Sequence, residues 1–391
     1  MKKTLSILLA LALLLGIASV SLADAVTLKV WGAMPDQELL AELVENFKAA
    51  NPEIEWDITI GVVEEPDAKA RVLEDPAVAA DVFAFPNDQI IDLVNAGMLY
   101  EVTRNLDAIV AANAAGAVAS ATVGGELFAY PMTADNGYFL YYDKSILSEE
   151  DVQSLDGILA KANEAGKKVF MNVANGWFIA SFFFGAGCTL DIDENGKQIC
   201  DFNSPQGVLA AEAIRAFTAD PAFLGGDGAV LQGGMGDTIC AGVSGTWDAD
   251  AMKDRLGDNY AAAKLPTFTL GGEQAQMGSF IGTKLIGVNS QTDFPVEAMM
   301  LAEYLTSEEA QMLRFIQRSL GPSNLNVAAS DAVKADIALA ALAAQSQFGV
   351  VQNVLGMYWS PAEALGQTFV NKSGDDIQGL LDALVAQATA E

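Results

Sequence analysis

Several side chains suited to sugar binding occupy predicted loops between the strands and helices of this chain. The flat face of an aromatic ring packs against the C–H face of a sugar, and carboxylates or amides bond pairs of its hydroxyl groups. The tryptophans in such loops are Trp177, Trp247 and Trp359, and the other candidates are Asp36, Gln37, Phe85, Asp88, Asp135, Asn136 and Tyr358. Open α/β sheets bind ligands outside the carboxyl ends of their strands. These positions therefore predict a carbohydrate site at such an edge.

The most informative stretch runs from residue 242 to residue 289. An apolar strand is predicted at residues 238–243; it leads into Gly245, and Trp247 follows on a turn before a small helix at residues 248–256. Residues 261–265 and 284–288 are two further apolar runs. A tryptophan where a strand changes into a helix is poorly placed for a core and well placed to line a crevice. Because a single tryptophan is usually a core residue, the prediction depends on all three.

Two motifs in this stretch carry a family resemblance. They read Ser244-Gly245-Thr246-Trp247 and Leu265-Pro266-Thr267-Phe268. In these motifs, and over most of its mature length, the chain resembles the maltose/maltodextrin-binding proteins, which are extracytoplasmic receptors of sugar ABC importers. The resemblance implies a monomeric receptor without catalytic residues, metal or cofactor. Its implied partners are an oligosaccharide and the permease subunits of an ABC transporter.

The resemblance also assigns the ligand-binding residues motif by motif. The family's polar loop after the first strand falls on residues 34–37, its aromatic-x-x-Asp on residues 85–88, and its acidic residue after the first crossing on Asp135. Its three stacking aromatics fall on tryptophans here, which favours a glucan such as maltose or maltotriose. The family often has Lys or Arg beside the acidic groups of the first loops, where this chain has Gln37 and Gln89. That departure leaves the length and linkage of the ligand open.

Strand and helix alternate along the chain, which predicts an α/β fold with helices on both faces of parallel sheets. The expected strands are residues 27–31, 56–62, 81–85, 139–142 and 169–172, and the expected helices include residues 37–50, 68–73, 88–96, 155–165, 178–184, 205–218, 295–305, 307–317, 332–344 and 376–388. The resemblance implies the type II, two-lobe fold of periplasmic binding proteins, joined by a hinge. It places the N-terminal lobe at residues 24–131 plus 275–322, and the C-terminal lobe at residues 132–274 plus 323–391.

Residues 1–23 have the pattern of a signal peptide. Lys2 and Lys3 precede an apolar run at residues 7–20, and small residues follow at Ser21 and Ala23. The run is shorter than the ~20 apolar residues that span a bilayer, and no cysteine near it would receive a lipid. The mature chain is therefore expected to begin at about Asp24. It would be periplasmic or extracellular, at the outer face of the cytoplasmic membrane.

The charge of the chain excludes several classes of function. The formal net charge is −30 and there is no histidine, which rules out His-based acid–base catalysis and His-ligated metals. A negative field of this size repels nucleic acid and anionic membrane surfaces, so neither is an expected partner.

The three cysteines are too few for a disulfide scaffold. Cys188 and Cys200 flank a hairpin signal at residues 193–196, so whether they form a disulfide depends on the register of that hairpin. Cys240 is expected to be a core thiol. Tyr141 and Tyr142 are expected to alternate between core and surface along one strand.

Three other functions remain open at this point. One is a secreted glycoside hydrolase, although with 51 acidic residues a carboxylate pair at glycosidase spacing is expected by chance. Another is a receptor for a galacto- or xylo-oligosaccharide. The third is a polyamine receptor, which the acidic charge would suit.

Overall fold

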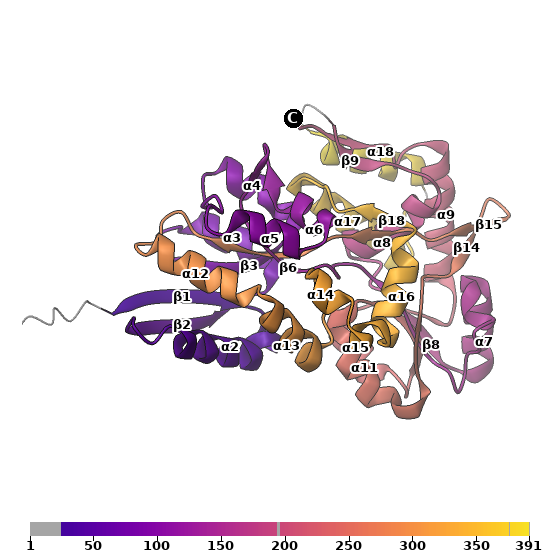
Figure 1. Cartoon of the computed structure of the whole chain (residues 1–391). Coiled ribbons are helices and arrows are strands. Elements are labelled where there is room, and N and C mark those ends of the chain that lie inside the picture. The colour runs from indigo at the N-terminus through magenta and orange to yellow at the C-terminus, as the bar shows by residue number, and fades with distance from the viewer. Residues whose placement is uncertain (1–24, 194–195, 375, 391) are drawn as a thin grey trace, which may run out of the picture.

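The fold contains two five-stranded sheets that are built from different parts of the chain (Figure 1). The computed structural model describes residues 25–193, 196–374 and 376–390, so the predicted signal peptide lies outside the described residues. The first sheet has the order β2-β1-β3-β17-β6, with the bounds β2 Trp56–Val62, β1 Val26–Gly32, β3 Val82–Pro86, β17 Lys284–Val288 and β6 Tyr130–Thr133. Strands β2, β1 and β3 are parallel, whereas β17 is antiparallel to both of its neighbours.

The second sheet repeats this arrangement. Its order is β11-β8-β12-β7-β13, with the bounds β11 Phe223–Leu224, β8 Lys168–Phe170, β12 Ile239–Ser244, β7 Phe139–Asp143 and β13 Tyr260–Ala263. Strands β11, β8 and β12 are parallel, and β7 is antiparallel to both neighbours. In both sheets the fourth strand in the order is the reversed one, and it is out of sequence order. This is the α/β architecture that the alternating pattern predicts.

Helices cover both faces of the first sheet because each has one apolar face. They are α2 Gln37–Ala50, α3 Ala68–Glu74, α4 Ile90–Asn95, α5 Leu106–Ala112, α6 Ala115–Ser120, α12 Pro295–Leu305 and α13 Glu308–Arg318. In α2 the buried residues are spaced three or four apart, from Leu39 and Leu40 to Phe47. Figure 1 shows α3 to α6 on one side of strands β1 to β3, with α2 and α13 on the other.

The second sheet is also buried on both faces. Its helices are α7 Leu155–Ala165, α8 Gly176–Gly185, α9 Pro205–Ala219, α10 Gly228–Gly234, α11 Ala249–Leu256, α16 Ile337–Ser346, α17 Trp359–Val370 and α18 Ile377–Ala388. Leu140 and Tyr142 of β7 pack in one core cluster, while Phe139 and Tyr141 pack in the cluster on the opposite face. The expectation of a surface tyrosine was therefore wrong: Tyr141 and Tyr142 are both buried, because helices cover both faces.

Several short strands lie outside the two five-stranded sheets. Strand β16 Ser279–Ile281 precedes β17 and pairs in parallel with β18 Gly349–Val351. The hairpin of β14 Thr267–Leu270 and β15 Glu273–Gln276 spans the predicted lobe boundary at residue 275, and β14 contacts α7 and α9. Two further short hairpins are β4 Thr122–Val123 with β5 Glu126–Leu127, and β9 Leu190–Ile192 with β10 Gln198–Cys200.

One local expectation differs from the structure. The helix expected at residues 332–344 is two helices, α15 Asp331–Lys334 and α16, because the Asp336 side chain caps the second by accepting from Leu339 N–H. The remaining helix of this region is α14 Leu325–Ala328.

All three cysteines are free thiols. The register of the β9–β10 hairpin places Cys200 opposite Leu190, so Cys188, two residues earlier, has no cysteine across from it. The Cys188 thiol instead lies 3.7 Å from the Ser204 hydroxyl. Cys240 is buried, as expected of a core thiol.

Within the described residues, no helix combines the length and apolar character needed to cross a membrane.

Candidate functional site

A cavity of about 580 Å³ lies between the loops at the edges of the two sheets. The first sheet contributes the loops after β1, β2 and β3, and the second contributes the loops after β8 and β12. Parallel strands of one sheet end at the same edge, so their loops gather around one crevice. Small-molecule sites usually have volumes of ~300–1,000 Å³, so this cavity is large enough for such a ligand.

The three tryptophans singled out in the sequence all line this cavity. Trp177 lies in the first turn of α8, Trp247 in the short helix η5 (Thr246–Asp248) after β12, and Trp359 at the start of α17. The ring centroids of Trp177 and Trp247 are 5.7 Å apart. All three side chains are half-buried. Three separate helices thus give the cavity an aromatic wall.

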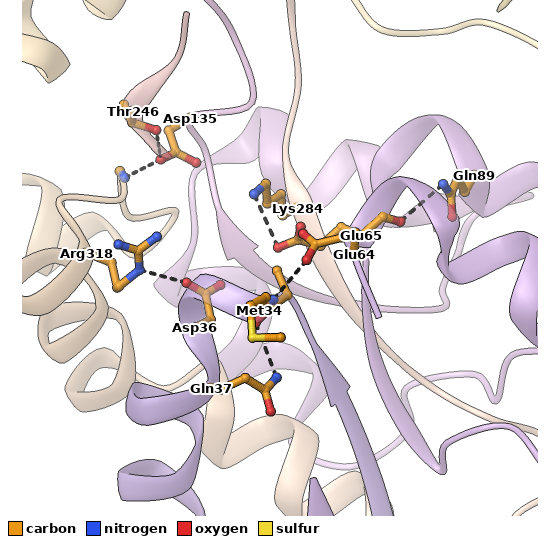
Figure 2. Close-up of polar contacts among 12 residues, drawn as sticks. Met34, Asp36, Gln37, Glu64, Glu65, Gln89, Asp135, Thr246, Lys284 and Arg318 are labelled. Atoms are coloured by element: carbon orange, nitrogen blue, oxygen red, sulfur yellow. Dashed lines mark hydrogen bonds and ion pairs between the residues drawn. The ribbon is translucent and has the colours of Figure 1, made fainter. Parts of the chain in front are cut away.

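Three of the predicted polar residues, Asp36, Asp88 and Asn136, also line the cavity. Asp36 follows β1, and its carboxylate accepts a hydrogen bond of 2.9 Å from Arg318 Nε (Figure 2). Arg318 ends α13 and also lies 3.7 Å from the Asp250 carboxylate of α11. The Arg318 guanidinium therefore connects a loop of the first sheet with a helix of the second.

The Asp88 carboxyl has an unusual environment. It lies in the turn η3 (Asn87–Gln89) after β3, and its Oδ1 is buried without a hydrogen-bond partner among the described residues. Burial raises the pKa of this carboxyl to about 7, although the Lys69 ammonium lowers it in part. A carboxyl oxygen without a partner on a cavity wall can accept hydrogen bonds from a ligand, and such bonds favour the charged form of the carboxyl.

The Asp88 pKa predicts a pH-dependent stability. The ordinary value is 3.8 and the folded value is about 7, so the folded state keeps a proton that the unfolded state loses. The stability of the wild type should therefore fall as pH rises from about 4 to about 7, and no further above that. Asp88→Asn, which cannot ionise, should show a Tm advantage over the wild type that grows between pH 4 and pH 8. Calorimetry of both proteins in the same buffers would measure this, and a Tm difference independent of pH would contradict it.

Four other predicted site residues have side chains that lie outside the cavity. Phe85 is fully buried in the first core, packed on Phe83, because every residue of β3 is covered. Gln37 Nε2 donates to the carbonyl oxygens of Gly32 and Ala33, at 2.8 and 3.2 Å, and so fixes the loop after β1.

The other two are Asp135 and Tyr358. Asp135 is 2% exposed, and its Oδ2 accepts hydrogen bonds of 2.6 Å from Thr246 Oγ1 and Gly321 N–H. Tyr358 is also buried, and its hydroxyl donates to the carbonyl oxygen of Gly176 at 2.8 Å. Both side chains support the cavity from behind: Asp135 holds the turn that precedes Trp247, and Tyr358 holds the start of α8.

The sequence patterns did not point to the basic residues of the cavity. Lys69, Lys284 and Arg318 line it, whereas Gln37 and Gln89, the two glutamines noted in the first loops, bond backbone groups. Gln89 Nε2 donates to Pro66 O at 2.7 Å. The positive charge comes instead from other segments of the chain.

Lys284 is the most buried of these cations. It is the first residue of β17 and pairs with Pro86, the last residue of β3, because β17 runs antiparallel to β3. Its ammonium lies 3.3 Å from the Glu65 carboxylate (Figure 2). It also lies 5.9 Å from the ring centroid of Trp247. Burial lowers the Lys284 pKa, but the attraction of Glu65 and other carboxylates outweighs it and the pKa is raised. A lysine at the start of an apolar strand was the signal in the sequence.

The part of the chain that the structure describes contains no group of three or more Cys, Asp or Glu side chains arranged to hold a metal ion. The cavity is instead lined by indole rings, carboxylates, amides and three cations. This combination can bind a polyhydroxylated ligand through ring stacking and hydrogen bonds.

Comparison with known proteins identifies the family of this chain. The family model for bacterial extracellular solute-binding proteins matches residues 42–341. A protein solved with acarbose is 31% identical, with 94% of this chain and 99% of that chain covered and a TM-score of 0.87. A maltodextrin-binding protein from L. casei, solved without ligand, is 26% identical, with 94% and 100% covered and a TM-score of 0.77.

More distant structures share the fold. The maltotriose-binding protein of Thermus thermophilus, solved with maltotriose, is 20% identical, with 93% of this chain and 99% of that chain covered and a TM-score of 0.81. A separate comparison with curated proteins found no match. With its fold and more than half of its length matched, the chain belongs to the family of bacterial extracellular solute-binding proteins.

Proposed function

We propose that this chain is the sugar receptor of an ABC importer, that it binds maltose or maltooligosaccharides in the cavity between the sheets, and that it delivers them to a membrane permease. The observation that carries the proposal is the meeting of Trp177, Trp247 and Trp359 in one cavity. A curved α-1,4 chain presents successive apolar ring faces, which indoles from three helices can follow. The similarity to proteins solved with acarbose or named for maltodextrin supports the same class of ligand.

The ligand would bridge two lobes and so favour a closed form. Residues 24–131 with 275–322 would form one lobe, and residues 132–274 with 323–391 the other. Asp36 and Asp88 would bond hydroxyl groups from the first lobe, while the tryptophans would stack from the second. A ligand favours closure only through contacts with both lobes, and the permease would recognise that closed form. The chain would act outside the cytoplasmic membrane as a monomer, after cleavage of residues 1–23.

A polyamine is less well matched to the cavity than a sugar. Three of the carboxylates that line the cavity already have partners: Glu65 pairs with Lys284, Asp36 pairs with Arg318, and Asp248 accepts from two neighbouring side chains. A polycation would need several free carboxylates, whereas one wall of this cavity is formed by indole rings.

A thermal-shift panel tests the proposed function. Ligand binding to the folded state alone raises Tm by mass action. Maltose and maltotriose at millimolar concentration should raise Tm, and galacto-oligosaccharides, xylo-oligosaccharides and a polyamine should not. A Tm shift with one of those compounds instead would show that the ligand is not a glucan, and the proposal that the chain is a receptor would stand. Release of reducing ends from maltotriose would contradict the receptor and favour a hydrolase.

Asp88→Ala should weaken maltotriose binding by ~1–3 kcal/mol, because it removes an acceptor for ligand hydroxyls. Calorimetric titration of the variant and the wild type at pH 8, where Asp88 is charged, would measure the loss. Asp107→Ala, at an exposed position of α5 outside the cavity, is the matched control. Unchanged affinity in the Asp88 variant would remove this residue from the site.

A further inference from the structure

Gln352 lies at the junction of the two halves of the cavity, although no sequence motif pointed to it. It follows β18, lines the cavity and is 5% exposed. Its backbone is fixed at both ends: its N–H donates to Ile281 O at 2.9 Å, and its carbonyl accepts from Asn87 Nδ2 at 3.0 Å. Asn87 directly precedes Asp88, so the Gln352 backbone is tied to the turn that carries this carboxyl.

The Gln352 side chain reaches the aromatic wall. Its Oε1 accepts hydrogen bonds from Trp177 Nε1 at 2.7 Å and from Asn136 Nδ2 at 3.2 Å. An indole N–H can only donate, so the amide oxygen must be the atom that faces it. An amide oxygen has two lone pairs, and both are used here. The orientation of the Gln352 amide is therefore determined.

The Trp177 indole also contacts aromatic rings. The Tyr138 ring packs on it at 4.6 Å between centroids, and the Trp247 ring at 5.7 Å. Such contacts fill space, whereas a hydrogen bond of 2.7 Å also fixes a direction. The indole has a single N–H group, and Gln352 accepts it.

We propose that Gln352 is a positioning residue for the ligand: it fixes the Trp177 indole in the cavity and connects it to the turn that carries Asp88. Because Asn87 and Trp177 both donate hydrogen bonds to Gln352, the position of the turn that carries Asp88 and the position of the Trp177 indole depend on each other. The effect on ligand affinity rests on the proposed function. The effect on the Trp177 indole does not, because it can be measured without ligand.

Indole resonances in ¹⁵N–¹H NMR spectra test the ligand-free part. The chain has five tryptophans, and Trp177→Phe identifies the resonance of Trp177 by its loss. Gln352→Met, of similar volume but without a strong acceptor, should shift the Trp177 indole proton upfield and speed its exchange with solvent. Gln352→Glu keeps an acceptor oxygen and should retain a downfield, protected indole proton. An unchanged Trp177 resonance in Gln352→Met would overturn the proposal.

Gln345→Met is the matched control. Gln345 is also a buried glutamine with hydrogen bonds, to Leu265 N–H and Met277 O, but it does not line the cavity. Its replacement should destabilise the fold without moving the Trp177 indole resonance. An equal shift in this control would show that any loss of a buried glutamine disturbs Trp177, and would also overturn the proposal.

Maltotriose titration tests the part that concerns affinity. Gln352→Met should weaken binding about tenfold in the wild-type background, as expected for one lost hydrogen bond. In the Trp177→Phe background, which lacks the indole N–H, the same change should cost much less. Equal losses in both backgrounds would contradict the positioning role. If the wild type binds no oligosaccharide, the proposed function fails, and the NMR result still decides whether Gln352 fixes the indole.

Discussion

Gly245→Ala is expected to weaken maltotriose binding roughly 100-fold, although Gly245 itself makes no predicted contact with the ligand. A Cβ atom at this position would lie 2.1 Å from Cη2 and Cζ3 of the Trp247 ring, far inside van der Waals contact. The backbone φ of Gly245 is −111°, which any residue can adopt. The strain would therefore fall on the indole, which must leave its place on the cavity wall. Calorimetric titration of the variant and the wild type would measure the loss.

Gly116→Ala is the control for this prediction. Gly116 lies in α6, and a Cβ there would meet nothing within 4 Å, so its affinity for maltotriose should match that of the wild type. The tryptophan fluorescence of Gly245→Ala should also change, because Trp247 would enter a different environment. An affinity within twofold of the wild type would show that Trp247 does not stack on the ligand.

Lys284→Met is expected to cost ~3–5 kcal/mol of unfolding free energy, because it leaves the Glu65 carboxylate buried without its partner. The two side chains are 13% and 7% exposed and 3.3 Å apart. In a chain of this size the loss corresponds to a Tm roughly 5 °C lower. Denaturant unfolding and calorimetry in the absence of ligand would measure it.

Two further variants show whether the lost stability comes from breaking the buried ion pair or from removing the lysine alone. The double variant Lys284→Met with Glu65→Leu should recover most of the stability, because no uncompensated charge remains. Lys161→Met removes the lysine of an exposed pair with Glu164 and should leave the Tm nearly unchanged. If the double variant is no more stable than Lys284→Met, Glu65 is not the cause of the loss.

Local sequence patterns predicted most of the elements that surround the site. The expected bounds of α2, β2, α7 and α12 coincide with those in the structure, because apolar periodicity and capping residues are local signals. The tryptophans were found for the same reason: each lies where a strand or loop changes into a helix. The cavity wall that they form follows from the order of the strands.

The rest of the site depends on contacts between distant segments, which no local pattern reports. Tyr358 and Trp359 are neighbours, yet Tyr358 is buried against Gly176 while Trp359 lines the cavity. Which of the two side chains lines the cavity therefore depends on a difference of one residue at the start of α17. Lys284 reaches the cavity because β17 is antiparallel to β3, and Gln352 because β18 pairs with β16. Strand pairing of this kind is fixed by the fold as a whole.

A crystal structure of the mature protein with maltotriose is the most direct test of the central claim, that the cavity between the two sheets is an oligosaccharide site. We expect density for the sugar in this cavity, with glucose rings stacked on the indoles of Trp177, Trp247 and Trp359 and hydroxyl groups bonded to Asp88. Sugar bound elsewhere, or a cavity without sugar at saturating maltotriose, would contradict the account.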